Sequence, residues 1–411
     1  MKLAVADSAP EPLGGRLQVR PGLARPFNLV STRPDWVERL TQGKSAAAAP
    51  DLLATVFNLC GQSHRLCATL ALQAASGNTG PLNAAAQRQL HSETRREHLR
   101  RITLDWPLQL AASADPQTAF QQAALAAYQT LQADVLARKA SQPAAPDAAA
   151  AAKDQNTRLA TDAAPPAPED AALPIWLETQ WLGVPARQWL NRWDEAPHDW
   201  LHHWCSATPG WLPELLAHAQ SAADSPMAAP RPLQVHAAPQ QLMALAGELQ
   251  ASAAFTRQPY WQQQSAETGP WTRLKQPNPE IFNTAWLRLG ARLAELVRLS
   301  LPGDSDDSGH SSTQWLQSGS LAIGENAGLA WVEMARGLLI HFIQTNGPGA
   351  GATIRRCRVL APTEWNFHPE GAVAQQLETL PTHLTPAHAQ HVRALMTAFD
   401  PCVRFDLPPK A

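Results

Sequence analysis

The chain has 411 residues, with 33 basic and 35 acidic side chains and a formal net charge of -2. This balance gives no electrostatic reason to expect nucleic acid or an anionic membrane as a partner. Hydrophobic residues make up 45% of the chain, which allows a sizeable core, but no stretch has the length of a signal peptide or a membrane-spanning helix. Five cysteines without an export signal favour reduced thiols. We therefore expect a cytoplasmic protein.

Apolar residues recur at three- and four-residue spacing along much of the chain, which predicts helices. The predicted helices cover residues 51–76, 83–105, 117–139, 177–193, 240–252, 281–300 and 386–398. Strand patterns come late, at 329–333, 337–344 and 353–360, and the sequence NGPGAG between the last two predicts a hairpin. We expect a mainly α (α+β) fold in which a helical bundle accompanies a small antiparallel sheet.

Two segments differ in composition from the rest of the chain. Residues 140–174 consist largely of alanine and proline, so they have few apolar side chains with which to offset the entropy of ordering. Residues 303–312 (GDSDDSGHSS) are polar and contain glycine. We predict that both are flexible insertions within a single domain spanning residues 1–411.

The sequence NLCGQSHRLCA at 58–68 places Cys60, His64 and Cys67 close together. In a continuous helix the two cysteines would share a face but lie about 10 Å apart along the axis, too far to bind one ion together. A turn at Gly61 would shorten that distance. A structural zinc site is disfavoured because it needs four ligands and no second ligand pair lies nearby.

A second candidate metal motif is PHDWLHHWC at 197–205, where His198, His202 and Cys205 have helical spacing. The surrounding tryptophans favour an amphipathic helix that packs against the core. We interpret this motif, and the remaining thiol of Cys357, as structural.

Four segments occur in the order seen in large subunits of nickel-iron hydrogenases. They are CGQSHRLC, VEMARGLLIHF, APTEWNFHP and FDPCVRF. Residues 13–19 and 83–106 resemble the N-terminal strand and a long helix of the same family. The resemblance spans nearly the whole chain and implies a hydrogenase large-subunit fold in which the two motif-bearing ends of the chain meet at the core.

The chain departs from the enzyme pattern at the metal ligands. In the enzymes, two cysteine pairs supply four thiolates to a nickel-iron centre, and here only Cys60 and Cys402 match the first member of each pair. Ser63 and Phe405 stand where the second, bridging cysteines would be. Since serine is a poor soft ligand and phenylalanine is none, we expect no nickel and no hydrogenase activity.

Other positions of the enzyme pattern are altered as well. Cys67 and Pro408 stand at the two histidine positions of the cysteine motifs, and Gly14 replaces the glutamate of the proton path. These losses remove the relay that hydrogen turnover requires. We therefore predict that the protein is not an enzyme.

The pocket for diatomic iron ligands is retained. By resemblance, Arg336 matches the arginine over the iron and Thr363 the hydroxyl residue that hydrogen-bonds a cyanide. This combination is similar to the hydrogenase accessory proteins called HupK or HoxV. The resemblance implies a scaffold that receives the Fe(CN)2(CO) unit from maturation chaperones and passes it to the apo large subunit.

In that interpretation Cys60 and Cys402 bind the iron, Arg336 and Thr363 hold the cyanides, and His64 and Cys67 assist at the site. Each residue also has a plainer interpretation. The thiols could be buried hydrophobes, His64 a helix-surface histidine, and Arg336 a buried arginine paired with Glu333 or Glu364. Two other functions stay open: a metal-free large-subunit mimic that acts as an assembly chaperone, and an enzyme that uses Cys60 and Cys67 in redox chemistry.

Overall fold

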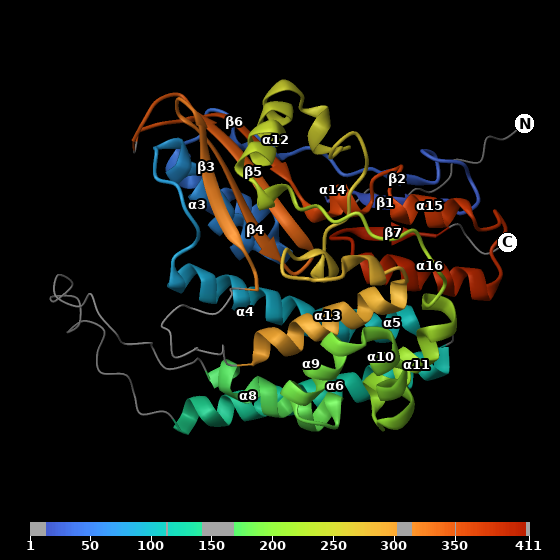
Figure 1. The fold of residues 1–411 in the computed structure, drawn as a ribbon. Helices are drawn as coiled ribbons and strands as arrows, with labels where there is room; N and C mark the ends of the chain where they lie inside the picture. The colour runs from blue at the N-terminus through green and yellow to red at the C-terminus, as the bar shows by residue number, and fades with distance from the viewer. Residues whose placement is uncertain (1–13, 112–113, 142–167, 302–314, 350, 408–411) are drawn as a thin grey trace, which may run out of the picture.

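The computed structural model describes residues 14–111, 114–141, 168–301, 315–349 and 351–407. Most of residues 140–174 and all of 303–312, the two predicted insertions, lie outside these ranges. Within them a helical bundle is joined to two small sheets (Figure 1). The predicted α+β architecture is confirmed.

The larger sheet has four antiparallel strands in the order β3-β4-β5-β6. Their bounds are Ser318–Gly324, Ala327–Met334, Gly337–Thr345 and Ile354–Leu360. The last three correspond to the predicted strands, and β5 and β6 form the predicted hairpin. Strand β3 was not predicted.

Helix α3 (Gly61–Ala75) packs against one face of this sheet, and α12 (Pro239–Ala251) is part of the apolar cluster on the other face. Gly328 on β4 permits the close approach of α3, because a Cβ there would overlap the backbone of Ala71 and Ala75. The sheet is therefore buried on both faces, which explains the nearly continuous apolar sequences of β4 and β5.

The smaller sheet joins the two ends of the chain. Its strands β1 (Arg16–Val19), β2 (Leu29–Ser31) and β7 (Arg404–Asp406) have the order β2-β1-β7, and β1 pairs with β7 in parallel. Leu17 lies opposite Phe405, so residues separated by most of the chain are neighbours. This pairing holds the C-terminal cysteine motif beside the N-terminal strand.

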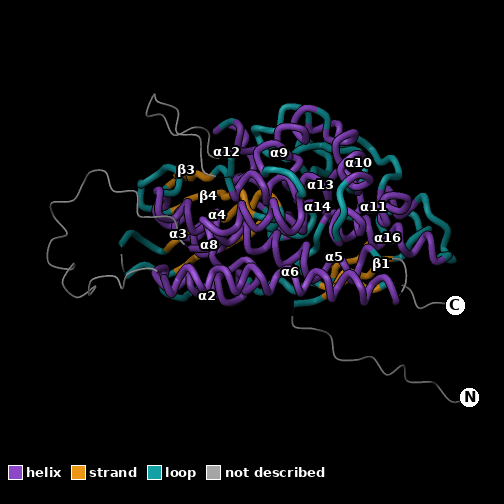
Figure 2. The backbone as a smooth tube through the Cα atoms, turned by 90° about the horizontal axis from the view of Figure 1, so that it is seen from below, coloured by secondary structure: helices purple, strands orange, loops and turns teal. Residues whose placement is uncertain are grey.

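The bundle lies below the larger sheet in Figure 1, and α6 crosses it in the view from below (Figure 2). Helix α13 occupies its centre and is buried along almost all of its length. The bundle consists of α4 (Ala84–Arg100), α5 (Trp106–Leu110), α6 (Ala114–Ser141), α8 (Pro168–Leu177), α9 (Ala186–Glu195), α10 (Pro197–Ala207), α11 (Trp211–Ala223), α13 (Ala285–Ser300) and α16 (Pro386–Phe399).

Short helices complete the fold near the smaller sheet and the cysteine motifs. They are α1 (Val37–Thr41), α2 (Ala49–Val56), α14 (Pro362–Asn366) and α15 (Ala372–Glu378). The helix predicted over 51–76 is interrupted, because a 3-10 turn at Asn58–Cys60 separates α2 from α3. No helix among the described residues is long and apolar enough to cross a membrane.

Candidate functional site

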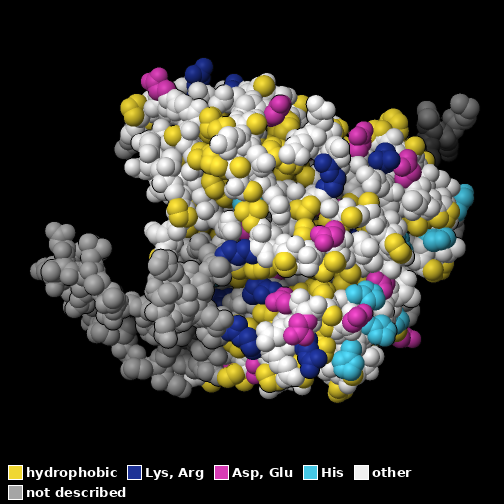
Figure 3. Space-filling view, in the orientation of Figure 1, with side chains coloured by type: hydrophobic (Ala, Val, Ile, Leu, Met, Phe, Trp, Pro, Cys, Tyr) yellow, Lys and Arg dark blue, Asp and Glu magenta, His cyan; other side chains and the backbone are white. Residues whose placement is uncertain are grey.

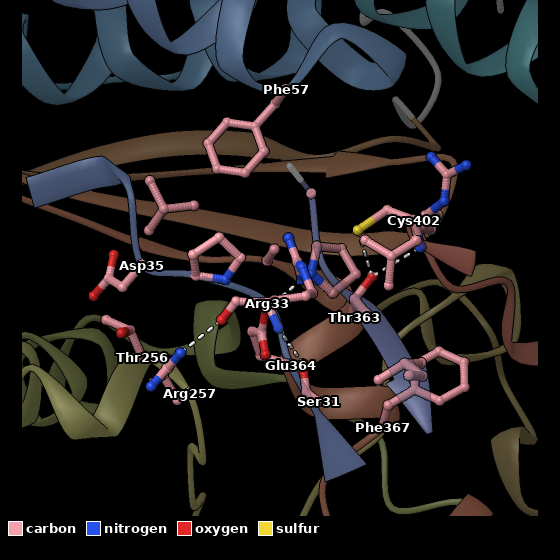
Figure 4. Close-up of a pocket in the computed structure, with 18 of the residues that line it drawn as sticks. Ser31, Arg33, Asp35, Phe57, Thr256, Arg257, Thr363, Glu364, Phe367 and Cys402 are labelled. Carbon is pink, nitrogen blue, oxygen red and sulfur yellow. Dashed lines mark hydrogen bonds and ion pairs between the residues drawn. The ribbon is translucent and has the colours of Figure 1, made fainter. Parts of the chain in front are cut away.

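Cys60 and Cys402 line the same cavity, which has a volume of about 500 Å³. Arg336, Thr363 and His64 line it too. Figure 4 shows the Cys402 sulfur turned toward Arg33 and Thr363 inside this space. The structure thus brings together five of the six residues selected from the sequence.

Cys60 is placed by the start of α3. It is the last residue of the 3-10 turn and immediately precedes Gly61, where a Cβ would lie 2.6 Å from the carbonyl oxygen of Ala54. The carboxylate of Glu93 on α4 accepts hydrogen bonds from the backbone N–H groups of Gln62 and Ser63, both at 2.8 Å. An acidic side chain at a helix N-terminus is stabilising, so Glu93 fixes the end of α3 that carries Cys60.

Cys402 lies on the loop between α16 and β7 and is half-buried. The hydroxyl of Thr363 on α14 donates to the sulfur of Cys402 at 3.3 Å. The backbone N–H of Cys402 donates to the same hydroxyl oxygen at 3.4 Å. Asp400, two residues earlier, has a left-handed backbone (φ 53°), which Asp tolerates better than most residues. This turn directs the loop from α16 toward the cavity.

Arg336 lies in the tight turn between β4 and β5 and is 2% exposed. It forms ion pairs with Glu97 on α4 and with Asp400 at 3.3 Å, and not with Glu333 or Glu364. Burial opposes its charged form, but Asp400, Glu97 and the two cysteines raise the pKa of Arg336 above its usual value. Its Nη1 atom is buried without a hydrogen-bond partner, so the N–H groups of this atom remain available to a ligand.

Burial raises the pKa of the Cys60 thiol to about 12, although the charge of Arg336 works in the opposite direction. The thiol is therefore protonated at neutral pH when no metal is bound. A metal ligand must be the thiolate, so metal binding at Cys60 has to displace a proton.

His64 reaches the cavity from α3 but is held by other contacts. Its ring stacks on Phe57 with centroids 3.8 Å apart, and its Nδ1 lies 3.0 Å from Nε2 of His341 on β5. Burial, followed by His341 and Arg33, lowers the pKa of His64 well below its usual value. The imidazole is therefore neutral and ties the start of α3 to the sheet.

Cys67 is the candidate that does not line this cavity. It is fully buried between α3 and the sheet, where its sulfur faces the carbonyl oxygens of Ala330 at 3.4 Å and Leu339 at 3.8 Å. Burial raises the pKa of its thiol above the normal range. These contacts are those of a packed core thiol.

The motif at 197–205 forms helix α10, as predicted, with Trp204 and Cys205 buried. Its histidines lie on the surface, where Figure 3 shows histidines gathered over the region of α10 and α11. His198 pairs with Asp224. In the described part of the chain, no three His, Cys, Asp or Glu side chains form a group that could hold a metal ion by themselves.

No protein-family model matches the chain. It is, however, 39% identical to the hydrogenase expression/formation protein HoxV of Cupriavidus necator over 398 residues, which cover 96% of this chain and 95% of HoxV. The chain belongs to the HoxV and HupK family of hydrogenase expression/formation proteins. It is also 29% identical to HupK of Rhizobium leguminosarum bv. viciae, over 96% of this chain and 95% of HupK.

The fold of this HoxV/HupK-family chain is that of a hydrogenase large subunit. It is similar to the Ni-Fe-Se hydrogenase of D. vulgaris Hildenborough in the as-isolated oxidized state, with a TM-score of 0.50 and 14% identity over 91% of this chain and 92% of the hydrogenase chain. The reduced state of that enzyme gives the same TM-score. The predicted large-subunit fold is confirmed.

Ser63 and Phe405 stand at the two positions where the enzyme pattern has its bridging cysteines. Ser63 is buried and donates its hydroxyl to Glu93, and Phe405 lies on β7. Neither residue lines the cavity that holds Cys60 and Cys402. Gly14, at the position of the enzyme glutamate, does line it but brings no side chain that could carry a proton.

Several residues that line the cavity or contact its lining were missed from the sequence. Arg33 lines it and pairs with Glu364, while Glu97 and Asp400 orient Arg336. Asp400 was visible in the FDPC motif, but no local pattern marked Arg33 or Glu97. Their roles depend on segments far apart in sequence, which the fold brings together.

Proposed function

We propose that this protein is a scaffold in the maturation of a [NiFe]-hydrogenase. In this proposal it receives the Fe(CN)2(CO) unit from maturation chaperones and passes it to the apo large subunit in the cytoplasm. Relatives that are named hydrogenase expression/formation proteins support the role in maturation. The iron unit is cargo in this proposal, and no nickel is bound.

The observation that carries the proposal is the position of Cys60 and Cys402 in one cavity, beside Arg336 and Thr363. Thiolates are the soft donors that suit an iron carrying carbonyl and cyanide ligands. Two thiolates leave the iron with few fixed protein ligands, which favours later release.

The polar groups of the cavity suit the cyanides. A cyanide nitrogen is a good hydrogen-bond acceptor, and the unpartnered Nη1 of buried Arg336 is a charged donor. The hydroxyl of Thr363, which donates to the sulfur of Cys402, is a second donor on the same cavity. Because Arg336 and Thr363 are both buried, each such bond is stronger than it would be in water.

The proposal assigns no bond-making chemistry to the protein. The carbonyl and cyanides stay on the iron, and the only exchange is that of thiolate ligands between carrier proteins. His64 supports the site by fixing the start of α3, through Phe57 and His341. Cys67 has no part in cargo binding, because its sulfur faces the sheet.

The test is the metal content of the protein purified without oxygen after coexpression with the maturation proteins. We expect iron in proportion to protein, no nickel, and loss of the iron in Cys60→Ala and Cys402→Ala. Cys205→Ala and Cys357→Ala are matched controls, because both thiols are buried in the core outside the cavity. If both cavity variants keep hydrogenase maturation intact, the protein acts instead as a metal-free mimic of the large subunit.

A further inference from the structure

A second hollow lies beside the cavity, and its walls come from α5 with the turn before it, from α16 and from residues 400–407. This C-terminal groove has a volume of about 700 Å³. Cys402, Val403 and Leu59 line both the groove and the cavity, so the two spaces adjoin at the loop that carries Cys402. A molecule bound in the groove would therefore contact this loop.

The walls of the groove are fixed by contacts between segments far apart in sequence. Gln390 on α16 donates to the carbonyl oxygen of Leu110 at the end of α5, at 2.5 Å. Arg101, in the π-helical turn before α5, pairs with Asp105 at 2.6 Å and with Asp400 at 3.0 Å. The groove is thus a preformed surface, which lowers the entropic cost of binding.

Three carboxylates line the groove among the described residues, and each of them has an ion-pair partner. Asp105 and Asp400 both pair with Arg101. Asp406 pairs with Arg16 at 2.9 Å. The negative charges of the groove are therefore already offset by the protein itself.

Two arginines of the groove have no such partner. Arg393 on α16 is half-buried, and Arg404 on β7 is exposed. No carboxylate in the described part of the chain pairs with either guanidinium. The groove therefore carries an excess of positive charge, although the whole chain has a formal net charge of -2.

Apolar side chains lie beside these charges. Leu59 and Leu108 line the groove and are 40% and 41% exposed, and Phe405 and Leu407 are half-buried in it. Arginine together with exposed apolar side chains is typical of protein–protein interfaces. A small anion would leave the apolar side chains exposed, whereas a polypeptide segment would cover them.

We propose that the C-terminal groove is the docking site for an acidic segment of the protein that exchanges the iron unit with this chain. Carboxylates of that segment pair with Arg393 and Arg404, because a guanidinium can bind a carboxylate through two parallel hydrogen bonds. Apolar side chains of the segment cover Leu59 and Leu108. Docking places the partner against the loop that carries Cys402. The partner's role in cargo exchange rests on the proposed function.

The test places a photocrosslinking amino acid at position 108 of the full chain, in place of Leu108, and coexpresses the chain with the hydrogenase maturation proteins and the apo large subunit. Mass spectrometry identifies the crosslinked peptides. We expect crosslinks to a segment of one of these proteins in which Asp and Glu outnumber Lys and Arg. Combining Arg393→Glu with Arg404→Glu should lower the yield by at least about tenfold, because like charges then face each other.

Met243 and Arg355 supply the matched controls. Met243 on α12 is 46% exposed, and Figure 1 shows α12 away from α5, so the same crosslinking amino acid at position 243 should not capture that segment. Arg355 on β6 is exposed and has no ion pair with another described residue, so Arg355→Glu should keep the wild-type yield from position 108. A thermal melt shows whether each variant keeps its fold.

Absence of crosslinks from position 108 of the folded protein would overturn the proposal, as would a yield that the double charge reversal leaves unchanged. Crosslinks to a basic segment, to a protein outside this set, to a second copy of the chain or within the chain itself would overturn it too. Failure of the scaffold function would appear instead as absence of iron from the purified wild-type protein, so the two failures are distinguishable.

Discussion

The hydroxyl of Thr363 lies 3.3 Å from the sulfur of Cys402 and joins helix α14 to the loop after α16. The same oxygen accepts the backbone N–H of Cys402 at 3.4 Å. Thr363 therefore both places the thiol and offers the cavity a donor that can turn from the sulfur to a cyanide.

Replacing Thr363 by valine tests this double role. The variant keeps the shape of the side chain but loses the hydroxyl, a change that typically costs about 1 kcal/mol for a net hydrogen bond. We expect weaker retention of the iron unit and a shift of one cyanide stretching band in the infrared spectrum. Thr363→Ser should retain the wild-type band positions, and unaltered bands in the valine variant would exclude a bond from Thr363 to cyanide.

Metal binding should depend on pH in a direction set by Cys60. Burial raises the pKa of this thiol to about 12, so across the neutral range binding must release its proton. The affinity of the site for a metal ion should rise with pH, by up to about tenfold per pH unit when binding displaces one proton. Cadmium ion is a suitable soft-metal probe, and calorimetry in buffers of different ionisation enthalpy counts the protons released.

The control for this measurement is Cys60→Ala, in which the dependence on pH should become shallower. Affinity that stays flat between about pH 6 and 8 in the wild type would mean that Cys60 is not a ligand, because a thiol with a raised pKa cannot bind without losing its proton.

Removal of the Cys67 thiol should leave the cargo site intact. Its sulfur faces carbonyl oxygens of β4 and β5 inside the core. We expect Cys67→Ala to lower the free energy of unfolding by about 1 kcal/mol, as a small buried side chain is shortened, while iron content stays at the wild-type level. Denaturant unfolding and metal analysis measure the two effects, and loss of iron from a stably folded variant would restore Cys67 as a site residue.

The buried carboxylates beside the cavity should make the fold sensitive to acid. Burial alone would raise the pKa of Glu97, but Arg336 with Arg100 and Arg101 holds it well below the usual value. The pKa of Asp400 is also lowered, because Arg336, Arg101 and Arg292 outweigh its burial.

A carboxyl group with a depressed folded-state pKa stabilises the fold above its unfolded pKa of about 4 and loses that contribution as the pH falls further. We therefore expect the free energy of unfolding to decrease with falling pH below about 5. Glu97→Gln should be less stable at neutral pH and show a weaker decrease in acid. A free energy of unfolding that stays constant down to about pH 3, which is about one unit below the pKa of an unfolded carboxyl group, would contradict this account.

The sequence predicted the parts of the fold that rest on local pattern. Helical spacing located α4 and α13, and apolar runs located β4 and β5. Strand β3 was missed because its sequence SGSLAIG is rich in small residues, and Gly319 is needed there to make room for the ring of Trp331. The parallel pairing of β1 with β7 has no local signal at all.

The site was predicted to a similar extent. Cys60 and Cys402 could be paired only through the order of the motifs, and the structure places both on one cavity. Cys67 was predicted to assist at the site, but the turn before Gly61 directs its thiol and that of Cys60 to different surroundings. Arg33 carried no signal, because its ion pair with Glu364 spans most of the chain.

Infrared spectroscopy of the protein isolated with its maturation partners tests the central claim most directly. If Cys60 and Cys402 bind one iron together, the spectrum should contain bands in the carbonyl and cyanide stretching regions. These bands should disappear when either residue is replaced by alanine, and they should persist in Cys205→Ala. The claim would be contradicted if the bands persisted in a variant that lacks both cavity thiols. It would also be contradicted if the wild-type protein, isolated with its maturation partners, showed no such bands.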